Sequence, residues 1–206
     1  MRTLVIDSAT EACSVALFDD TTLIGGDWRL LGRGHAEALV PMVAALPGKG
    51  RADRIAVSLG PGSFTGLRVG LAAARALALA WQADLVGYPT LALVAAQALH
   101  GRDDGEVAVC TTGGHGEWFV ASYAADGSPV QPLASLAPEQ AAARMASALV
   151  AGSQAEALVR LRGSGEALTI MPDARHFDLL RSDALMPETA LIYGRAPDAR
   201  LPGAPR

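Results

Sequence analysis

The stretch SLGPGSFTGLRVG, residues 58–70, separates a short apolar run from a long alanine-rich one. The run before it, residues 55–57, has the composition of a buried strand, and the run after it, residues 71–81, that of a helix. Glycines in such a turn allow close contacts that a Cβ would prevent, while proline fixes φ and a hydroxyl can cap the helix. The sequence therefore predicts a strand, a specified turn and a helix, with the turn built by Gly60, Pro61, Gly62, Ser63, Thr65 and Gly66.

The same turn could also hold a phosphate, because free N–H groups and the helix dipole both favour an anion at a helix start. The residues that phosphate loops use are missing, however. No Gly-Lys-Ser/Thr closes the turn as in a Walker motif, and Gly60-Pro61-Gly62 does not begin a G-x-G-x-x-G dinucleotide fingerprint. We therefore favour the structural interpretation, in which small residues let two elements pack closely.

The composition indicates a real core and an acidic surface. Half of the 206 residues are hydrophobic, enough for one large domain or two small ones, and the formal net charge is -4. Phosphate neutralisation needs clustered Lys and Arg, so we do not expect this chain to grip nucleic acid by itself. Any role with RNA would need a partner.

Cysteine usage and the N-terminus indicate the compartment. Cys13 and Cys110 lie far apart in apolar, strand-like runs, which favours buried reduced thiols and leaves a disulfide between them open. The N-terminal run meets Asp7 before a signal segment could form, and the helix after Gly70 carries Arg75 and is too short for a membrane span. We expect a soluble, cytoplasmic protein.

The first half of the chain alternates extended and helical patterns. Strands are predicted at 3–7, 13–18, 23–28, 54–58 and 86–88, and helices at 35–46, after the central turn, and at 90–100 with Thr90 as cap. Pro41 either kinks the helix at 35–46 or marks its true start. The polar segment 101–105 then breaks the pattern, so we place a first domain at 1–102.

The second half begins as the first did, with strands at 107–111 and 118–123, a hairpin signal at 126–127 and a further extended piece. A helix is predicted at 138–150, and strands at 158–162 and 167–171. We therefore expect an α/β protein with a structural duplication, mixed sheets covered by helices, a second domain at 103–206 and a flexible tail from about residue 196.

Three ordered segments carry a family resemblance. Residues 6–16 (IDSATEACSVA), 33–42 (RGHAEALVPM) and 60–70 (GPGSFTGLRVG) together resemble the TsaB (YeaZ) family, mainly over the first half of the chain. The resemblance implies a duplicated actin/Hsp70-like (ASKHA, RNase H-like) fold. It also implies a non-catalytic bacterial subunit that binds a TsaD-like catalytic subunit and supports formation of N6-threonylcarbamoyladenosine at position 37 of ANN-decoding tRNAs.

The residues can be weighed against that implication. ASKHA enzymes resemble a clamp with an acid after the first strand of each half; Asp7 fills the first position, but Thr112 stands at the second, where Mg²⁺ would lose an anionic ligand. We therefore expect no autonomous ATP turnover, no cofactor and no catalytic residue, and expect Asp7 to accept hydrogen bonds from the turn that follows it. The paired histidines of TsaD are absent, since Leu39 lies four residues after His35, so no metal site is expected.

The alternative is an independent enzyme, either an ASKHA-type ATP-dependent enzyme or a glycoprotease-like hydrolase. Ser63, His35 and Asp7 are the residue types of a catalytic triad, but no Gly-x-Ser-x-Gly elbow surrounds Ser63. Ser63 is better explained as a cap for helix N–H groups, and His35 as a solvated or helix-capping residue.

The two helices of the first half are the predicted interaction surface. In residues 66–81 the polar side chains are essentially Arg68 and Arg75, on nearly one stripe, and a helix apolar nearly all round is covered on more than one side. The resemblance implies that this region pairs with TsaD or with a second copy, with a TsaE-like ATPase as further partner and tRNA bound only through the complex. The predicted interface residues are His35, Leu39, Met42, Val43, Leu46, Leu67, Arg68, Gly70, Leu71, Ala74, Arg75 and Ala78; the alternative is their burial within the domain.

Overall fold

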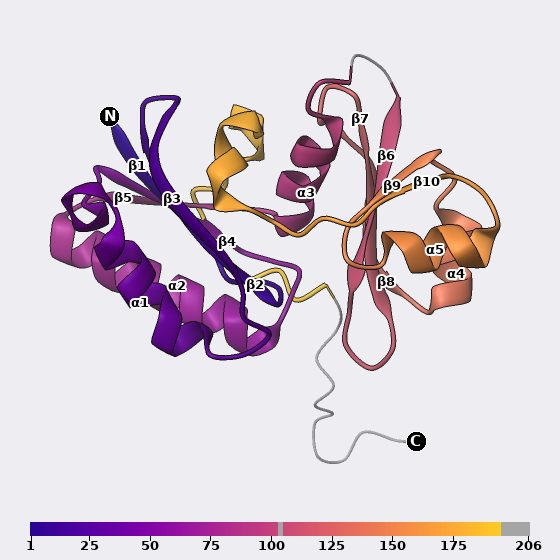
Figure 1. The fold of residues 1–206 in the computed structure, drawn as a ribbon, viewed down its shortest axis with the longest axis horizontal. Helices are drawn as coiled ribbons and strands as arrows, with labels where there is room; N and C mark the ends of the chain where they lie inside the picture. Colours follow the sequence, from indigo (N-terminus) through magenta and orange to yellow (C-terminus); the bar gives the residue numbers. More distant parts are fainter. Residues whose placement is uncertain (103–104, 195–206) are drawn as a thin grey trace.

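The computed structural model describes residues 1–102 and 105–194 and consists of two α/β halves that lie side by side (Figure 1). The first half is a five-stranded sheet with two long helices and a short 3-10 turn, η1 (Pro47–Gly50). Its elements are β1 (Arg2–Asp7), β2 (Ala12–Asp19), β3 (Thr22–Leu30), α1 (His35–Ala45), β4 (Arg54–Ser58), α2 (Phe64–Trp81) and β5 (Asp84–Tyr88).

The second half repeats this plan with shorter helices. After α3 (Thr90–Leu99), its elements are β6 (Glu106–Thr112), β7 (Trp118–Ala124), β8 (Pro129–Leu136), α4 (Pro138–Arg144), β9 (Leu149–Ala151), α5 (Ala155–Arg162) and β10 (Glu166–Leu168). The strand orders are β3-β2-β1-β4-β5 and β8-β7-β6-β9-β10, and in each half the first strand pairs antiparallel with the second and parallel with the fourth. The predicted duplication with mixed sheets is thus confirmed.

Three local predictions for the helices and strands are wrong. Residues 158–162 belong to α5 instead of a strand: Ala155 and Leu158 are buried one helical turn apart, and Gly163 ends the helix in the left-handed conformation. The helix predicted at 138–150 ends at Arg144, because residues 149–151 form β9 beside β6. The N-cap of α3 is Pro89, while the Thr90 hydroxyl bonds to Ser58.

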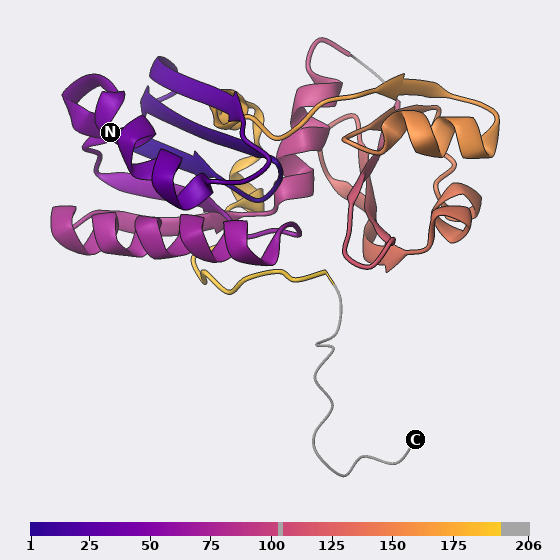
Figure 2. The same cartoon turned by 60° about the horizontal axis from the view of Figure 1, so that its bottom comes forward.

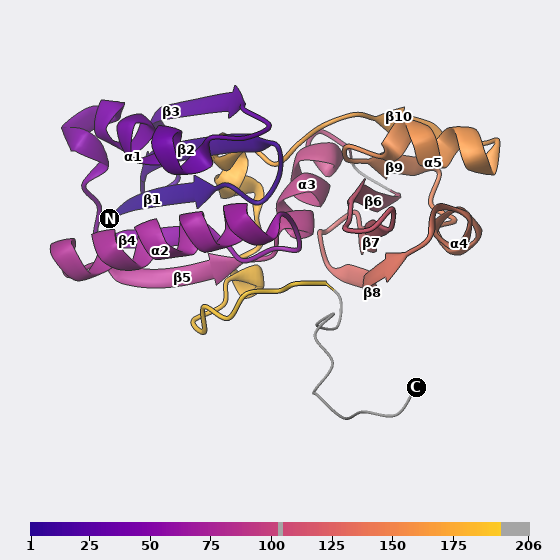
Figure 3. The ribbon, with the colours of Figure 1, turned by 90° about the horizontal axis from the view of Figure 1, so that it is seen from below.

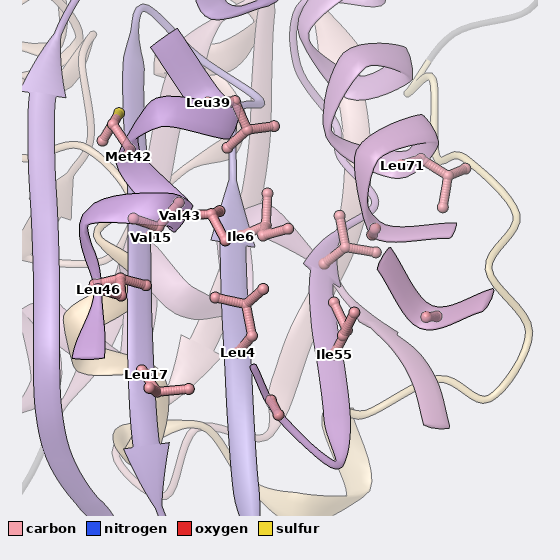
Figure 4. Packing of buried hydrophobic residues seen from close by; sticks show 14 of the residues in the cluster. Leu4, Ile6, Val15, Leu17, Leu39, Met42, Val43, Leu46, Ile55 and Leu71 are labelled. Carbon is pink, nitrogen blue, oxygen red and sulfur yellow. The ribbon is translucent and has the colours of Figure 1, made fainter. Parts of the chain in front are cut away.

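Both faces of the first sheet are covered, which explains why β1 and β2 are buried without alternation. On one face, α1 and α2 pack against side chains such as Leu4, Ile6, Val15 and Leu17 (Figures 2 and 4). Each buried leucine of this kind contributes about 2 kcal/mol through the area it removes from water.

The opposite face is covered by a segment from the far end of the chain. The 3-10 turn η2 (Ala174–Leu179) places Phe177 against Phe18 and Tyr88, with ring centroids 6.1 and 5.6 Å apart. A second 3-10 turn, η3 (Ser182–Ala184), follows, and the chain then runs back along α2 (Figure 3). The first sheet is therefore completed by residues beyond 170.

The domain boundary at 102/103 stays a prediction. Residues 103–104 and the tail from residue 196 lie outside the described residues. Helix α3, which the prediction assigns to the first domain, packs mainly with β6, β7 and η2. It therefore shares the core of the second half. Chain order and packing thus divide the molecule differently.

Helix α2 has 18 residues and, among the residues described, is the helix long and apolar enough by length and composition to cross a membrane. The expectation that it is too short is wrong, because the helix begins at Phe64, well before Gly70. One such helix is weak evidence for a span, since core helices of soluble proteins meet the same criterion, and the inner side of α2 packs on β4 and α1.

Candidate functional site

A cleft of about 1100 Å³ opens between the two halves. Its first wall is formed by the β1–β2 loop and by the starts of α1 and α2, and its second wall by the β6–β7 loop, with Phe119 and Tyr193 also lining it. Thr10, His35, Ser63 and Thr112 all face this space. The cleft therefore brings residues of the predicted turn opposite Thr112, at the end of β6.

The central turn is built as predicted around the start of α2. Ser63 is the N-cap, and its hydroxyl accepts a hydrogen bond from Gly66 N at 3.3 Å. Position 60 requires glycine because its φ is +107° and a Cβ there would lie 2.4 Å from the Ile192 carbonyl oxygen. Pro61 is buried behind the turn and Thr65 is exposed on it.

The β1–β2 loop lies directly on this turn. Ser63 N donates to the Ala9 carbonyl at 2.7 Å, and the Ser8 hydroxyl donates to the Gly66 carbonyl at 2.9 Å. A Cβ at Gly62 or Gly66 would lie 2.1 Å from the Ala9 or Ser8 carbonyl oxygen. The small residues therefore allow a loop of the same half to pack directly on the start of α2.

Asp7 lies beneath this loop and does not line the cleft. Its side chain is 1% exposed. Its carboxylate accepts hydrogen bonds from Ala9 N at 3.0 Å and from the Tyr88 hydroxyl at 3.2 Å. Burial raises the pKa of Asp7 to about 6, although these hydrogen bonds act in the opposite direction. The prediction that Asp7 serves the turn after β1 is confirmed by the bond to Ala9.

The corresponding end of β6 carries a neutral hydrogen-bonded group. Thr112 is exposed in the cleft; its N–H donates to the Ser153 hydroxyl at 3.1 Å, and its own hydroxyl accepts from the Gln154 amide at 2.9 Å. One strand-end position is thus buried and the other uncharged, so these two residues do not form an acidic clamp on an ion in the cleft.

His35 is tied to the backbone of the β1–β2 loop. Its Nε2 lies 2.9 Å from the Thr10 carbonyl oxygen and 3.3 Å from that of Ala12, so this nitrogen must carry the proton. It cannot then accept a proton from Ser63, and Asp7 is engaged by Ala9 and Tyr88. The structure does not bring Ser63, His35 and Asp7 together as a triad.

Over residues 1–102 and 105–194, no group of three His, Cys, Asp or Glu side chains is arranged to hold a metal ion. Cys13 and Cys110 are buried free thiols whose pKa values burial raises to about 11 and about 12. Thiols with raised pKa values are poor nucleophiles at neutral pH. This part of the chain offers no activated cysteine.

Most of the predicted interface side chains lie inside the first half. Burial within the domain, the alternative considered for them, holds for Leu39, Met42, Val43, Leu46, Leu67, Gly70, Leu71, Ala74 and Ala78. Arg68 and Arg75 are exposed on one side of α2, as their spacing predicted, and His35 is half-buried at the start of α1.

The sides of α1 and α2 that point away from the sheet carry many exposed apolar residues, which together we call the outer helix face. Val40 is 58% and Leu79 84% exposed. The remaining members are small or apolar exposed residues: Pro41, Ala44 and Ala45 of α1, and Ala72, Ala76 and Ala80 of α2. Helical spacing from Leu79 back to Ala76 and Ala72 was the available signal, but an all-apolar helix does not show which side is inner.

Comparison with known proteins gives a matching family model and curated relatives. A family model described as TsaD, tRNA N6-adenosine threonylcarbamoyltransferase, matches residues 29–180. The tRNA threonylcarbamoyladenosine biosynthesis protein TsaB of Escherichia coli K12 is 37% identical over 131 residues, which cover 61% of this chain and 56% of that protein. TsaB of Haemophilus influenzae is 41% identical over 99 residues, 45% of this chain and 40% of that protein. The chain thus spans about half the length of the curated relatives it matches.

Solved structures agree over nearly the whole chain. A Pseudomonas aeruginosa protein described as similar to peptidase YEAZ is 29% identical with a TM-score of 0.78, covering 94% of this chain and 99% of that one. YeaZ from Pseudomonas aeruginosa is 26% identical with a TM-score of 0.78, covering 93% and 99%. Together with the two matching sheets, these similarities confirm the predicted duplicated actin/Hsp70-like fold.

Proposed function

We infer that this chain, which belongs to the family whose model matches residues 29–180 and is similar to TsaB and YeaZ proteins, takes part in forming threonylcarbamoyladenosine in tRNA. In this proposal it acts as a non-catalytic subunit that binds a TsaD-like catalytic subunit, and the modified base is adenosine 37 of ANN-decoding tRNAs. Family membership supports the pathway. The observation that carries the subunit role is the outer helix face.

The outer helix face is a surface that a partner would be expected to cover. Leu79 is the most exposed large hydrophobic side chain among the residues described, and Val40 lies on the neighbouring helix. Their neighbours are alanines and Pro41, so two helices of a partner could approach closely. Exposed apolar side chains on two neighbouring helices of an acidic protein are typical of a protein interface.

The cleft supports a role without chemistry of its own. Asp7 is buried under the β1–β2 loop, Thr112 is uncharged, and the Nε2 of His35 is committed to two carbonyl oxygens. Asp7 and Thr112 are therefore not poised to act in the cleft, and Nε2 of His35 is not free to act as a general base. The independent-enzyme alternative is therefore the less supported one.

The remaining parts of the proposal concern partners and place. When no TsaD is present, the outer helix face would pair with that of a second copy, because the same apolar area must be covered. A TsaE-like ATPase completes the complex. The net charge of -4 favours contact with tRNA only through the complex, and the setting is the cytoplasm.

The test mixes the purified chain with TsaD from the same source and measures molar mass by light scattering and threonylcarbamoyl transfer to tRNA. We expect a heteromer that restores transfer and no transfer by this chain alone. Absence of a heteromer, combined with nucleotide or peptide turnover by this chain alone, would overturn the proposal.

Two leucine variants locate the contact. Leu79→Arg places a charge on the outer helix face, whereas Leu161→Arg makes the same change at a 48% exposed position on α5 of the second half. Leu79→Arg is expected to weaken the heteromer at least about tenfold, since a desolvated unpaired charge costs more than 1.4 kcal/mol. Leu161→Arg should leave it intact; equal loss in both variants would place the contact elsewhere.

A further inference from the structure

The segment Met186–Gly194, which we call the strap, runs from the edge of β5 along α2 to the cleft (Figure 3). At its start, Met186 and Gly87 exchange two backbone hydrogen bonds of 2.8 Å. Near its end, Ile192 N donates to the Leu59 carbonyl at 2.8 Å, just before the central turn. The strap is thus attached to the first half by its backbone.

Two arginines of α2 hold the middle and the end of the strap. Arg75 donates from Nη2 to the Thr189 carbonyl at 3.1 Å and to its hydroxyl at 3.3 Å. Arg68 donates from Nε and Nη2 to the Tyr193 hydroxyl, each at 3.4 Å. The Arg68 guanidinium also lies 3.6 Å from the centre of the Phe64 ring, which is 5.6 Å from the ring of Tyr193. The stripe of arginines therefore binds this chain's own strap.

Both flanks of the strap reach the second half. Just before it, Arg181 donates to the Asp126 carbonyl and carboxylate, in the turn between β7 and β8, at 3.1 and 3.2 Å. At its end, a Cβ built on Gly194 would lie 2.6 Å from the Phe119 ring of β7 and 3.1 Å from Pro61. The strap consequently crosses from the second half to the first and back to the cleft.

This path couples the strap to the cleft. Phe64, Arg68, Phe119 and Tyr193 all line the cleft, two from α2, one from β7 and one from the strap. If the halves moved apart, Gly194 would separate either from Phe119 or from Pro61. On the side of the cleft, the bonds from Arg68 and Arg75 to the strap join exposed side chains, and such contacts open at low free-energy cost compared with a core.

We propose that the strap is a clasp that sets the opening of the cleft between the two halves, held closed by Arg68 and Arg75 of α2. Its release lets the cleft widen while the buried packing of α3 with β6, β7 and η2 stays intact. The device is independent of what binds in the cleft or on the outer helix face.

The test measures the distance between spin labels on the two halves by pulsed electron resonance. Leu30→Cys on β3 and Arg160→Cys on α5 give exposed labelling sites, while Cys13 and Cys110 are buried and will not react. In the double variant Arg68→Ala/Arg75→Ala we expect a longer mean distance and a broader distribution. Thermal unfolding, followed in parallel, should remain a single cooperative transition.

Arg51→Ala is the matched control, because Arg51 is an exposed arginine of the same half that lies beside the N-terminus. It should leave the distance distribution unchanged. If the double variant does not fold, Met186→Pro tests the attachment of the strap at its other end, since it removes the N–H that bonds to the Gly87 carbonyl. A distribution in the folded variant that matches the parent, or an equal change in Arg51→Ala, overturns the proposal.

Discussion

At the scale of single residues, Asp7 is a carboxyl group in surroundings that disfavour its charged form. A carboxylate that is 1% exposed loses hydration, and three hydrogen-bonding groups, Ala9 N and the hydroxyls of Tyr88 and Ser58, only partly replace it. The bonds to Ala9 and Tyr88 hold the end of β1 to the loop that lies on α2. Asp7 therefore positions the β1–β2 loop, although burial disfavours its charged form.

That cost predicts a pH dependence of stability. Because the folded protein raises the pKa of Asp7 from 3.8 to about 6, the folded state binds this proton more tightly than the unfolded state. The contribution of Asp7 to the free energy of unfolding is largest below pH 4, falls as the pH rises through 6, and is about 3 kcal/mol smaller at pH 7.5. The free energy of unfolding of Asp7→Asn should lack this contribution over the same pH range.

The measurement is urea unfolding of both proteins from pH 4 to 8, and the difference between them isolates Asp7 from the other carboxylates. Asn can still accept from Ala9 N, and the Tyr88 hydroxyl keeps the Ile6 carbonyl as acceptor. A constant difference across the pH range would contradict the prediction.

Gly66 gives a steric prediction at the same scale. Gly66→Ala places a Cβ against the Ser8 carbonyl oxygen, and a backbone atom cannot move aside cheaply. We expect the free energy of unfolding to fall by about 1–3 kcal/mol. Thr65→Ala, at the exposed neighbouring position, should change it by less than about 0.5 kcal/mol. Chemical unfolding of the pair checks this, and equal effects would show that the close contact is not maintained.

At the scale of elements, α2 has two faces that the sequence does not distinguish. Ala74 and Ala78 lie in the core, whereas Ala72, Ala76 and Leu79 belong to the outer helix face. Both sets are apolar, so a hydrophobic pattern alone leaves the rotation of the helix about its axis undetermined. The contacts with β4 and α1 decide it.

Substitutions at two alanines of α2 test which side of the helix faces the core. Ala74 is 0% exposed, so Ala74→Arg would bury a long charged side chain and is expected to unfold the first half. Ala76→Arg lies on the outer helix face and should leave the far-ultraviolet circular dichroism and melting temperature nearly unchanged while weakening association with TsaD or with itself. A folded Ala74→Arg protein would contradict the assigned rotation of the helix.

At the scale of the whole molecule, the two halves are similar in topology but not independent in packing. The back of the first sheet is filled by Phe177 and its neighbours, which come from beyond the second sheet, and α3 shares the core of the second half. The boundary predicted at 102/103 follows a break in composition. The burial pattern instead ties the first sheet to residues 174–185.

This packing predicts that residues 1–102 do not fold alone. Without η2, the face carrying Val5, Phe18 and Tyr88 would be exposed to water, and the fragment could not bury enough apolar area for a stable core. We expect a fragment spectrum without dispersed amide resonances and no cooperative thermal transition. A dispersed spectrum would show that the first domain is autonomous.

Much of the fold could be predicted from the sequence, because it depends on local order. Glycine, proline and serine at fixed positions specify the turn before α2, and Ser63 caps that helix as its type and place predict. The succession of strands and helices in each half was sufficient to indicate the duplication. Short segments were the exception: the alternation in residues 158–162 fits a strand, but Ala155 and Leu158 bury one side of a helix.

The sequence by itself determined the strand–turn–helix unit, the order of the elements in the first half and the resemblance to the TsaB family, since these rest on residue types at fixed spacing. Only the tertiary structure decided which side of α1 and α2 is outer, what covers the back of the first sheet, and that Arg68 and Arg75 bind the strap. The physical reason is that these arrangements depend on contacts between elements that are separate in the sequence, which for Arg75 and Thr189 lie more than a hundred positions apart. Local periodicity carries no information about them.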